Sequence, residues 1–136
     1  MALPAPAPRG SAARRILVVD DNEDAAVILM QALEQLGYQV KVAHDGPSAL
    51  DACAVFQPDV ALLDIGLPVM DGYELAQRLR ESRQGQPHLR LVAITGYGQD
   101  KDRERSRRAG FEQHLVKPLD LAKIERAIEG ARDAHG

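Results

Sequence analysis

Apolar residues cluster in short blocks along the chain, and most of these blocks end in a polar residue. The blocks in residues 15–19, 59–63 and 90–94 show no alternation of polar and apolar positions, which is typical of strands buried on both faces of a sheet. Residues 38–43 alternate, and residues 111–116 form a short block, so we expect both to be edge strands. The pattern therefore predicts five strands, three of them central.

Apolar residues at helical spacing fill the segments between these blocks. We expect Asp21 or Asn22 to cap the first helix and Gly37 to end it, and we expect the second helix to begin near Pro47 and to stop before Pro58. The side chains expected to face the core are, helix by helix, Ala26, Leu29, Met30, Leu33 and Leu36; Ala49, Leu50 and Cys53; Leu75, Ala76 and Leu79 in residues 73–82; and Leu121, Ile124, Ala127 and Ile128 after Asp120.

The segment expected to form the fourth helix, residues 99–108, contains no apolar residue. A helix with so little to bury is weakly anchored to the sheet. Its mixed acidic and basic residues suit either a solvated, salt-bridged face or a basic docking patch. Gly110 is expected to end this helix, and the polar residues 83–88 are expected to form a loop.

Five repeats of strand and helix define an α/β fold. With right-handed crossovers, three central strands and two edge strands select a parallel sheet of order 2-1-3-4-5 with helices on both faces. We assign residues 15–133 to this one domain. Residues 1–14 are rich in proline and alanine and form a flexible tail or linker.

Composition restricts the surroundings and partners of the protein. A net charge of −3 favours neither nucleic acid nor an anionic membrane as a partner. Cys53 is the single cysteine, so an internal disulfide cannot form, which suits a reducing compartment. No apolar run approaches the ~20 residues that span a bilayer, and the chain begins without an apolar signal segment. We expect a cytoplasmic protein without a membrane span.

Polar residues of particular kinds follow the predicted strands. They are Asp20 and Asp21, Asp64, Thr95, and Lys117 with Pro118. The carboxyl ends of parallel strands meet at one edge of a sheet, where open α/β folds bind ligands. Three carboxylates gathered there repel one another, and a hard divalent cation such as Mg²⁺ relieves that repulsion. We expect Asp21 and Asp64 to bind the cation directly and Asp20 to act mainly through water.

At these residues the sequence resembles the receiver domain of bacterial two-component response regulators, either stand-alone or part of a hybrid sensor histidine kinase. The resemblance covers residues 15–131 and includes Pro68, Asp71 and Gly72 after the acceptor-like Asp64. It implies a flavodoxin-like (βα)5 fold that serves a phosphorelay. In such a relay, Asp64 takes a phosphoryl group from a phosphohistidine on a histidine kinase or a phosphotransfer domain.

The resemblance also implies a role for each site residue. The metal ligands are Asp20, Asp21, Asp64 and the backbone carbonyl of Gly66, for Mg²⁺ or alternatively Mn²⁺. The phosphoryl group is bound by Ile65, Gly66, Thr95, Gly96 and Lys117. Lys117 and Thr95 assist the transfer to Asp64, and the bond before Pro118 is cis.

Signal output is implied to pass through Thr95 and the residue three positions before Lys117. Receivers usually carry Tyr or Phe at that position, whereas this chain has His114. The face formed by the fourth helix, fifth strand and fifth helix would contact an output partner. The domain would be a monomer or a weak dimer that depends on phosphorylation, would not bind nucleic acid directly, and would be a switch that assists its own phosphorylation and dephosphorylation.

Two other classes of protein share parts of this pattern. A haloacid-dehalogenase-like phosphatase also uses a strand-end Asp nucleophile with Mg²⁺, but it needs a second Asp two residues later, where this chain has Gly66. A flavodoxin-like nucleotide binder needs amides or hydroxyls in its first loop. Here that loop, residues 20–24, is acidic and repels phosphate.

Overall fold

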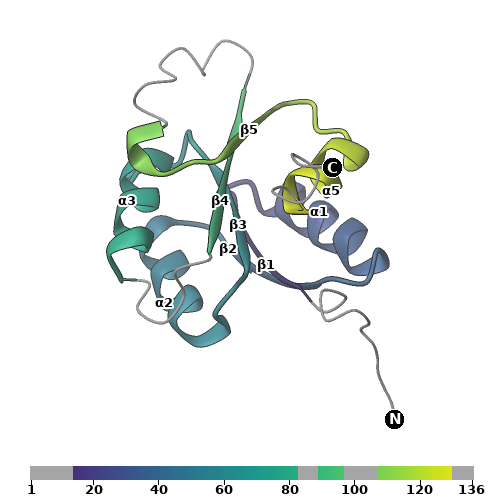
Figure 1. Cartoon of the computed structure of the whole chain (residues 1–136), viewed down its shortest axis with the longest axis horizontal. Helices are drawn as coiled ribbons and strands as arrows, with labels where there is room; N and C mark the ends of the chain where they lie inside the picture. Colours follow the sequence, from purple (N-terminus) through teal and green to yellow (C-terminus); the bar gives the residue numbers. More distant parts are fainter. Residues whose placement is uncertain (1–13, 83–88, 97–106, 130–136) are drawn as a thin grey trace.

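A five-stranded parallel sheet forms the centre of the protein (Figure 1). The computed structural model describes residues 14–82, 89–96 and 107–129. The strand order is β2-β1-β3-β4-β5, which confirms the predicted order 2-1-3-4-5. The strands are β1 Arg15–Val19, β2 Gln39–Ala43, β3 Val60–Asp64, β4 Arg90–Thr95 and β5 Gln113–Val116.

Burial along the strands agrees with their predicted places in the sheet. Every residue of β3 is buried, as are the last four of β1 and the last five of β4. The alternating strand β2 and the short strand β5 lie at the two edges and are partly exposed. An unbroken apolar run therefore marks the central strands, because both of their faces are covered.

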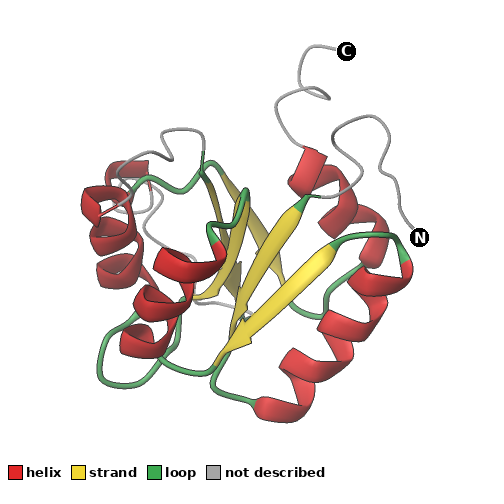
Figure 2. Ribbon diagram, turned by 90° about the horizontal axis from the view of Figure 1, so that it is seen from below, coloured by secondary structure: helices red, strands yellow, loops and turns green. Residues whose placement is uncertain are grey.

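Helices cover both faces of the sheet (Figure 2). Helices α2 and α3 lie on one side and α1 and α5 on the other (Figure 1), so the sheet separates two apolar cores. The helices are α1 Glu23–Gln35, α2 Gly46–Phe56, α3 Gly72–Ser82 and α5 Leu121–Glu129. Among the described residues, no helix is long and apolar enough to cross a membrane.

Local signals set the limits of the helices as expected. The Asn22 side chain accepts a hydrogen bond from the Ala25 amide at the start of α1, and Gly37 follows that helix with a positive φ of 102°. Asp45 caps α2 through the amide of Ser48. In α3, the three residues expected to face the core are fully buried.

Two residues at helix ends differ from the prediction. Leu36 is 41% exposed and Leu121 is 39% exposed, although both were expected to face the core. Leu36 follows the last turn of α1 as its C-cap and Leu121 is the first residue of α5. At these helix ends, helical spacing alone does not ensure burial.

The last strand is also shorter than predicted, because it begins at Gln113 and not at Phe111. The Phe111 side chain is buried against Tyr73, with 6.1 Å between the ring centroids. Most of the expected fourth helix, residues 99–108, lies outside the described residues; its residues 107 and 108 are described, and they are helical together with Ala109. Gly110 follows with a φ of 101°. Residues 1–13 of the predicted tail and the loop at 83–88 also lie outside the described residues, whereas Arg14, which was assigned to the tail, forms an ion pair with Glu129.

The first and last described residues are joined by a small polar cluster. Arg14 Nε lies 3.5 Å from Glu129 Oε1, and the Tyr38 hydroxyl donates a hydrogen bond of 3.0 Å to Glu129 Oε2. Burial, reinforced by the bond to Glu129, raises the pKa of Tyr38, so its hydroxyl keeps its proton at neutral pH. The end of α5 is thereby tied to the residue before β1 and to Tyr38, the residue before β2.

Gly72 permits a close contact between the start of α3 and the end of β3. Its N–H donates to the carbonyl oxygen of Ile65 at 3.0 Å. A Cβ at this position would lie 2.6 Å from Ile65 Cα and 2.8 Å from the carbonyl oxygen of Asp64. Both neighbours are backbone atoms, so they move only if the loop after β3 moves.

We therefore expect Gly72→Ala to lower the free energy of unfolding by about 1–3 kcal/mol, as overpacking does. Urea unfolding followed by circular dichroism measures the loss. Gly46→Ala is the matched control, because its Cβ would meet the flexible Met70 side chain, with Sδ at 2.6 Å. The control should lose less stability, and equal losses would contradict the backbone explanation.

Candidate phosphoacceptor site

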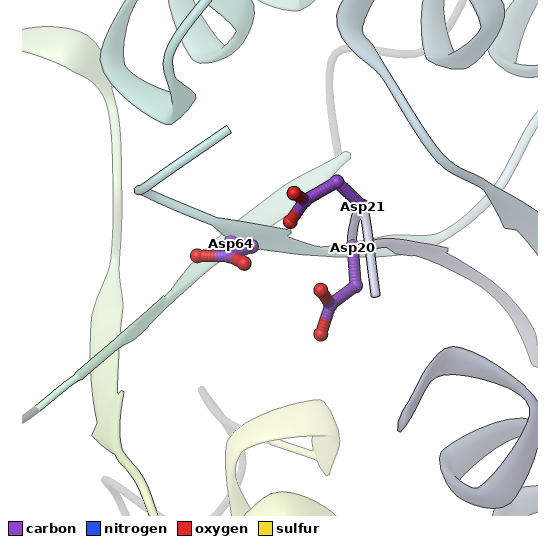
Figure 3. Close-up of side chains that lie close together, drawn as sticks. All are labelled: Asp20, Asp21 and Asp64. Carbon is purple, nitrogen blue, oxygen red and sulfur yellow. The ribbon is translucent and has the colours of Figure 1, made fainter. Parts of the chain in front are cut away.

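Three carboxylates meet at the carboxyl edge of the sheet (Figure 3). Asp20 and Asp21 follow β1, and Asp64 ends β3. Strands β1 and β3 are direct neighbours, with Val19 paired to Leu63, so the residues after each pair also lie close. One oxygen from each carboxylate falls within 4.8 Å of the others. The structure thus brings together the three acids that the sequence predicted.

Burial distinguishes the three acids. Asp20 is 8% exposed and Asp64 is 6% exposed, whereas Asp21 is exposed. Burial raises the pKa of Asp64, and the neighbouring Asp20 raises it further. The Gly66 amide, which donates to Asp64 Oδ1 at 2.9 Å, and Lys117 lower the same pKa. Repulsion was therefore a correct expectation for Asp64, but desolvation is the larger cause.

Lys117 and Thr95 reach the same edge from β5 and β4. Lys117 Nζ lies 3.7 Å from Asp64 Oδ2, and the Lys117 N–H donates to the Thr95 carbonyl at 2.8 Å. The bond between Lys117 and Pro118 is cis, the form that the resemblance implies. Thr95 is fully buried, and its hydroxyl oxygen has no hydrogen-bond partner among the described residues.

The backbone amides after Asp64 are not equally open to a ligand. The Ile65 N–H donates to the carbonyl of Ile94 at 3.0 Å and so extends the β3–β4 ladder. The Gly66 N–H points back to the Asp64 carboxylate. Of these two expected phosphoryl-binding amides, Gly66 is therefore the one directed at the site, while Ile65 is engaged in the sheet.

His114 lies on β5 beside Ala93 of β4. Side chains alternate along a strand, so His114 shares a sheet face with Ala93 and hence with Thr95. The His114 ring is half-buried and lies 6.0 Å from the Phe111 ring, centroid to centroid. Thr95 and His114 therefore occupy neighbouring places on the face that also carries Phe111.

His44, which was not predicted to belong to the site, lies next to the acidic turn. His44 is the residue after β2, and its Nδ1 is 3.0 Å from the carbonyl oxygen of Asp20. The two residues are separated by 24 positions in the chain. A lone histidine after an edge strand carries no local signal of such a contact.

The donor set fits a hard divalent cation. Carboxylate oxygens are the ligands that Mg²⁺ prefers, usually with several waters retained. The buried Thr95 hydroxyl, which lacks a partner among the described residues, and the Lys117 ammonium on Asp64 fit a bound phosphoryl group. One edge of the sheet thus offers a nucleophile, a cation site and donors for an anion.

Comparison with known proteins identifies the class. The family model of the response regulator receiver domain matches residues 16–129, so the chain belongs to the family of response regulator receiver domains. Sporulation initiation phosphotransferase F of Bacillus subtilis is 32% identical over 115 residues, which cover 85% of this chain and 90% of that protein.

Two further relatives are parts of sensor kinases. The sensor histidine kinase RcsC of Escherichia coli is 34% identical over 113 residues, which cover 83% of this chain but 12% of that protein. The receiver domain of a Pseudomonas aeruginosa sensor histidine kinase has a TM-score of 0.75 and 31% identity, covering 86% of this chain and 95% of that one. Its crystal structure has a magnesium ion coordinated in the active-site cleft.

These relationships establish phosphorelay signalling as the function of this chain. They confirm the expected family and fold, and they set aside the haloacid-dehalogenase-like phosphatase. The family is a phosphoacceptor switch and not a classical turnover enzyme.

The raised pKa of Asp64 has a consequence for stability. A carboxyl whose pKa is higher in the folded state stabilises that state fully below its ordinary value of about 3.9 and loses this contribution as the pH rises through the raised value. In the absence of metal, Asp64→Asn should therefore gain thermal stability over the parent as the pH rises from about 4 to 8. Thermal unfolding in a chelator, followed by circular dichroism, measures this difference.

The control for that comparison is Asp51→Asn, on the exposed face of α2. The difference in melting temperature between this variant and the parent should stay constant across the same pH range. An advantage of Asp64→Asn that is greatest at low pH would contradict the assigned direction.

Proposed function

We propose that Asp64 is the phosphoacceptor of this receiver and that it is phosphorylated in the presence of Mg²⁺. The observation that carries this proposal is the meeting of three carboxylates with the Lys117 ammonium, 3.7 Å from Asp64 Oδ2. Asp20, Asp21, Asp64 and the carbonyl of Gly66 would hold the cation, which would neutralise charge on the acids and on the incoming phosphoryl group. Mn²⁺ has the same ligand preference and is an alternative.

In the proposed reaction, a carboxylate oxygen of Asp64 forms a bond to phosphorus while the phosphorus–nitrogen bond of a phosphohistidine breaks. The electron pair of that bond stays on the imidazole of the donor. Such transfers depend on charge stabilisation and in-line positioning. Lys117 supplies positive charge, while the Thr95 hydroxyl and the Gly66 amide supply hydrogen bonds. The Gly96 amide is part of the same proposal, whereas Ile65 contributes through its place in the β3–β4 ladder.

The resulting aspartyl phosphate persists as a signal, because Gly66 provides no side chain to act as a general acid or base. The domain takes part in its own dephosphorylation only through the groups that bind the phosphoryl group. Cys53 is free and buried, which suits the reducing cytoplasm as the location of the relay.

We also propose Thr95 and His114 as the pair that transmits phosphorylation. The Thr95 hydroxyl would turn to the phosphoryl group, and the His114 ring would then move toward the space that the hydroxyl leaves. Output would pass through the face of the fourth helix, β5 and α5, where Val116 is 51% exposed. An output partner, or a second copy in a weak phosphorylation-dependent dimer, would bind there.

The phosphohistidine donor must approach over the rim of the site, and the structure has an apolar groove there. The groove lies between α1 and the segment that joins β5 to α5, and it includes Asp20 and Lys117 of the site itself. Ile28, which is 67% exposed, and Leu121 contribute apolar surface to it. We propose that the kinase or phosphotransfer domain docks along this groove.

Acetyl phosphate and Mg²⁺ should place one phosphoryl group on Asp64, since the site supplies the charge stabilisation that transfer requires. Mass spectrometry of the intact protein and of its peptides measures the extent and the position. Asp64→Asn should remain unmodified, and the adduct should be labile to hydroxylamine. Equal modification of Asp64→Asn would exclude Asp64 as the acceptor, and steady hydrolysis of p-nitrophenyl phosphate that depends on Asp64 would restore the phosphatase interpretation.

Ile28→Asp should weaken phosphorylation by a protein donor and leave that by acetyl phosphate unchanged, because only the protein donor needs the groove. With a phosphorylated histidine kinase domain that modifies the parent, we expect a loss of about tenfold or more in kcat/KM. Val55→Asp is the matched control, since Val55 is 87% exposed on α2, across the sheet (Figure 1). A similar loss for both variants, or none for either, would argue against the groove.

A further inference from the structure

His44 contacts the acidic turn through a hydrogen bond that does not depend on its charge. Its Nδ1 lies 3.0 Å from the carbonyl oxygen of Asp20, and the ring is half-buried. A carbonyl oxygen only accepts, so Nδ1 carries the hydrogen and donates it. This holds for the neutral ring with its hydrogen on Nδ1 and for the doubly protonated ring.

The bond from His44 extends the pairing of β1 with β2 beyond the last pair of the ladder, Val19 with Ala43. The Asp20 N–H donates to the Ala43 carbonyl at 3.1 Å, and the Asp20 carbonyl accepts from His44. Where the two strands separate, a side-chain hydrogen bond from His44 therefore follows the last backbone hydrogen bond between them. Both polar groups of the Asp20 main chain are held by residues 43 and 44.

The Asp20 carbonyl belongs to the peptide unit that links Asp20 to Asp21. Because this unit is planar, it fixes the distance between the Cα atoms of Asp20 and Asp21, so a bond to its carbonyl restrains the turn from which both side chains leave. Figure 3 shows the two side chains leaving this turn in different directions, with Asp64 beside them. The Asp20 carboxylate is itself restrained, because its Oδ1 accepts from the Asn22 amide at 2.9 Å. The position of this peptide unit thus restrains the backbone from which two of the three acids approach the third.

We propose that His44 is a positioning residue of the cation site. Its Nδ1–H holds the Asp20–Asp21 peptide unit in the orientation that presents both carboxylates to the cation alongside Asp64. The inference rests on the proposed function, since it concerns the Mg²⁺ site of the same acids. His44, the residue after β2, would thus help to shape a site whose acids come from β1 and β3.

Two substitutions of matched shape test the role of the donor. Asn has a side-chain amide that can take the place of Nδ1–H, whereas Leu has nearly the same shape and no donor. In His44→Leu, the dissociation constant for Mg²⁺ should rise about 3- to 10-fold, the equivalent of one net hydrogen bond. In His44→Asn it should return to within about twofold of the parent, since the donor is restored. Titration of the metal-free protein with Mg²⁺, followed by the backbone amide signals of residues 20, 21 and 64 in NMR spectra, measures these constants.

Phosphorylation gives a second measurement. With acetyl phosphate as donor, His44→Leu should need more Mg²⁺ for half-maximal rate but reach the rate of the parent at saturating Mg²⁺, because His44 touches neither the phosphoryl group nor Asp64. Gln39→Leu is a substitution at an exposed position of β2. It should change neither the dissociation constant for Mg²⁺ nor the Mg²⁺ concentration that gives half-maximal rate. The unmodified protein provides a test that needs no variant: long-range ¹⁵N NMR should show the hydrogen of the His44 ring on Nδ1.

Each possible outcome supports or overturns the inference. Parent-like Mg²⁺ binding by His44→Leu overturns it, as does equal weakening in the Leu and Asn variants or a neutral ring with its hydrogen on Nε2 alone. If the parent itself binds no Mg²⁺, the proposed function fails and the inference falls with it. If the parent binds Mg²⁺ and is phosphorylated while His44→Leu behaves identically, only the role of His44 is lost.

Discussion

The parallel pairing of β1 with β3 forces three acids to share one edge of the sheet. Asp20 and Asp21 follow one of these strands and Asp64 ends the other, so they cannot be separated without changing the register. The resulting cost is partly relieved by the protein, through the Gly66 amide and Lys117. In the proposed function, a bound cation would relieve the rest of that cost. Desolvation of Asp64 and its repulsion by Asp20 would then both favour binding of a cation at this edge.

Thr95 connects the site at this edge of the sheet to the proposed output surface. Thr95 is buried, and its hydroxyl has no hydrogen-bond partner in the described part of the chain. Such an arrangement costs free energy. Thr95 lies two residues along β4 from Ala93, which is paired to His114. A phosphoryl group that satisfies the Thr95 hydroxyl therefore acts on a strand whose neighbour forms part of the proposed output surface.

Most of the architecture was predictable from the sequence, because apolar runs without alternation mark central strands and right-handed crossovers leave few sheet orders. The acids, Thr95 and Lys117 could be placed at one edge for the same reason, since each follows a strand. Helix ends were less predictable. Leu36 and Leu121 have the spacing of core residues, but helical spacing alone does not ensure burial at the end of a helix.

Hydrogen bonds between segments that are distant in the sequence, and the energies of those contacts, were not predictable. The bond from His44 to Asp20 joins residues 24 apart, and no pattern within either segment encodes it. The engagement of the Ile65 amide by Ile94 depends on how far the β3–β4 ladder continues. Likewise, the sequence indicated repulsion at Asp64, but only the depth of burial shows that desolvation contributes more.

The cluster of Arg14, Tyr38 and Glu129 holds the entry and exit of the described fold side by side. A domain whose ends meet can be spliced into another chain, or have its ends joined and new ends opened elsewhere, without stretching its sheet. The phosphoacceptor edge lies at the opposite, carboxyl end of the strands, because Arg14 directly precedes β1 and Asp20 follows it. Linking another domain before Arg14 or after Glu129 thus leaves that edge uncovered. The fold can therefore be joined to other domains without blocking its site.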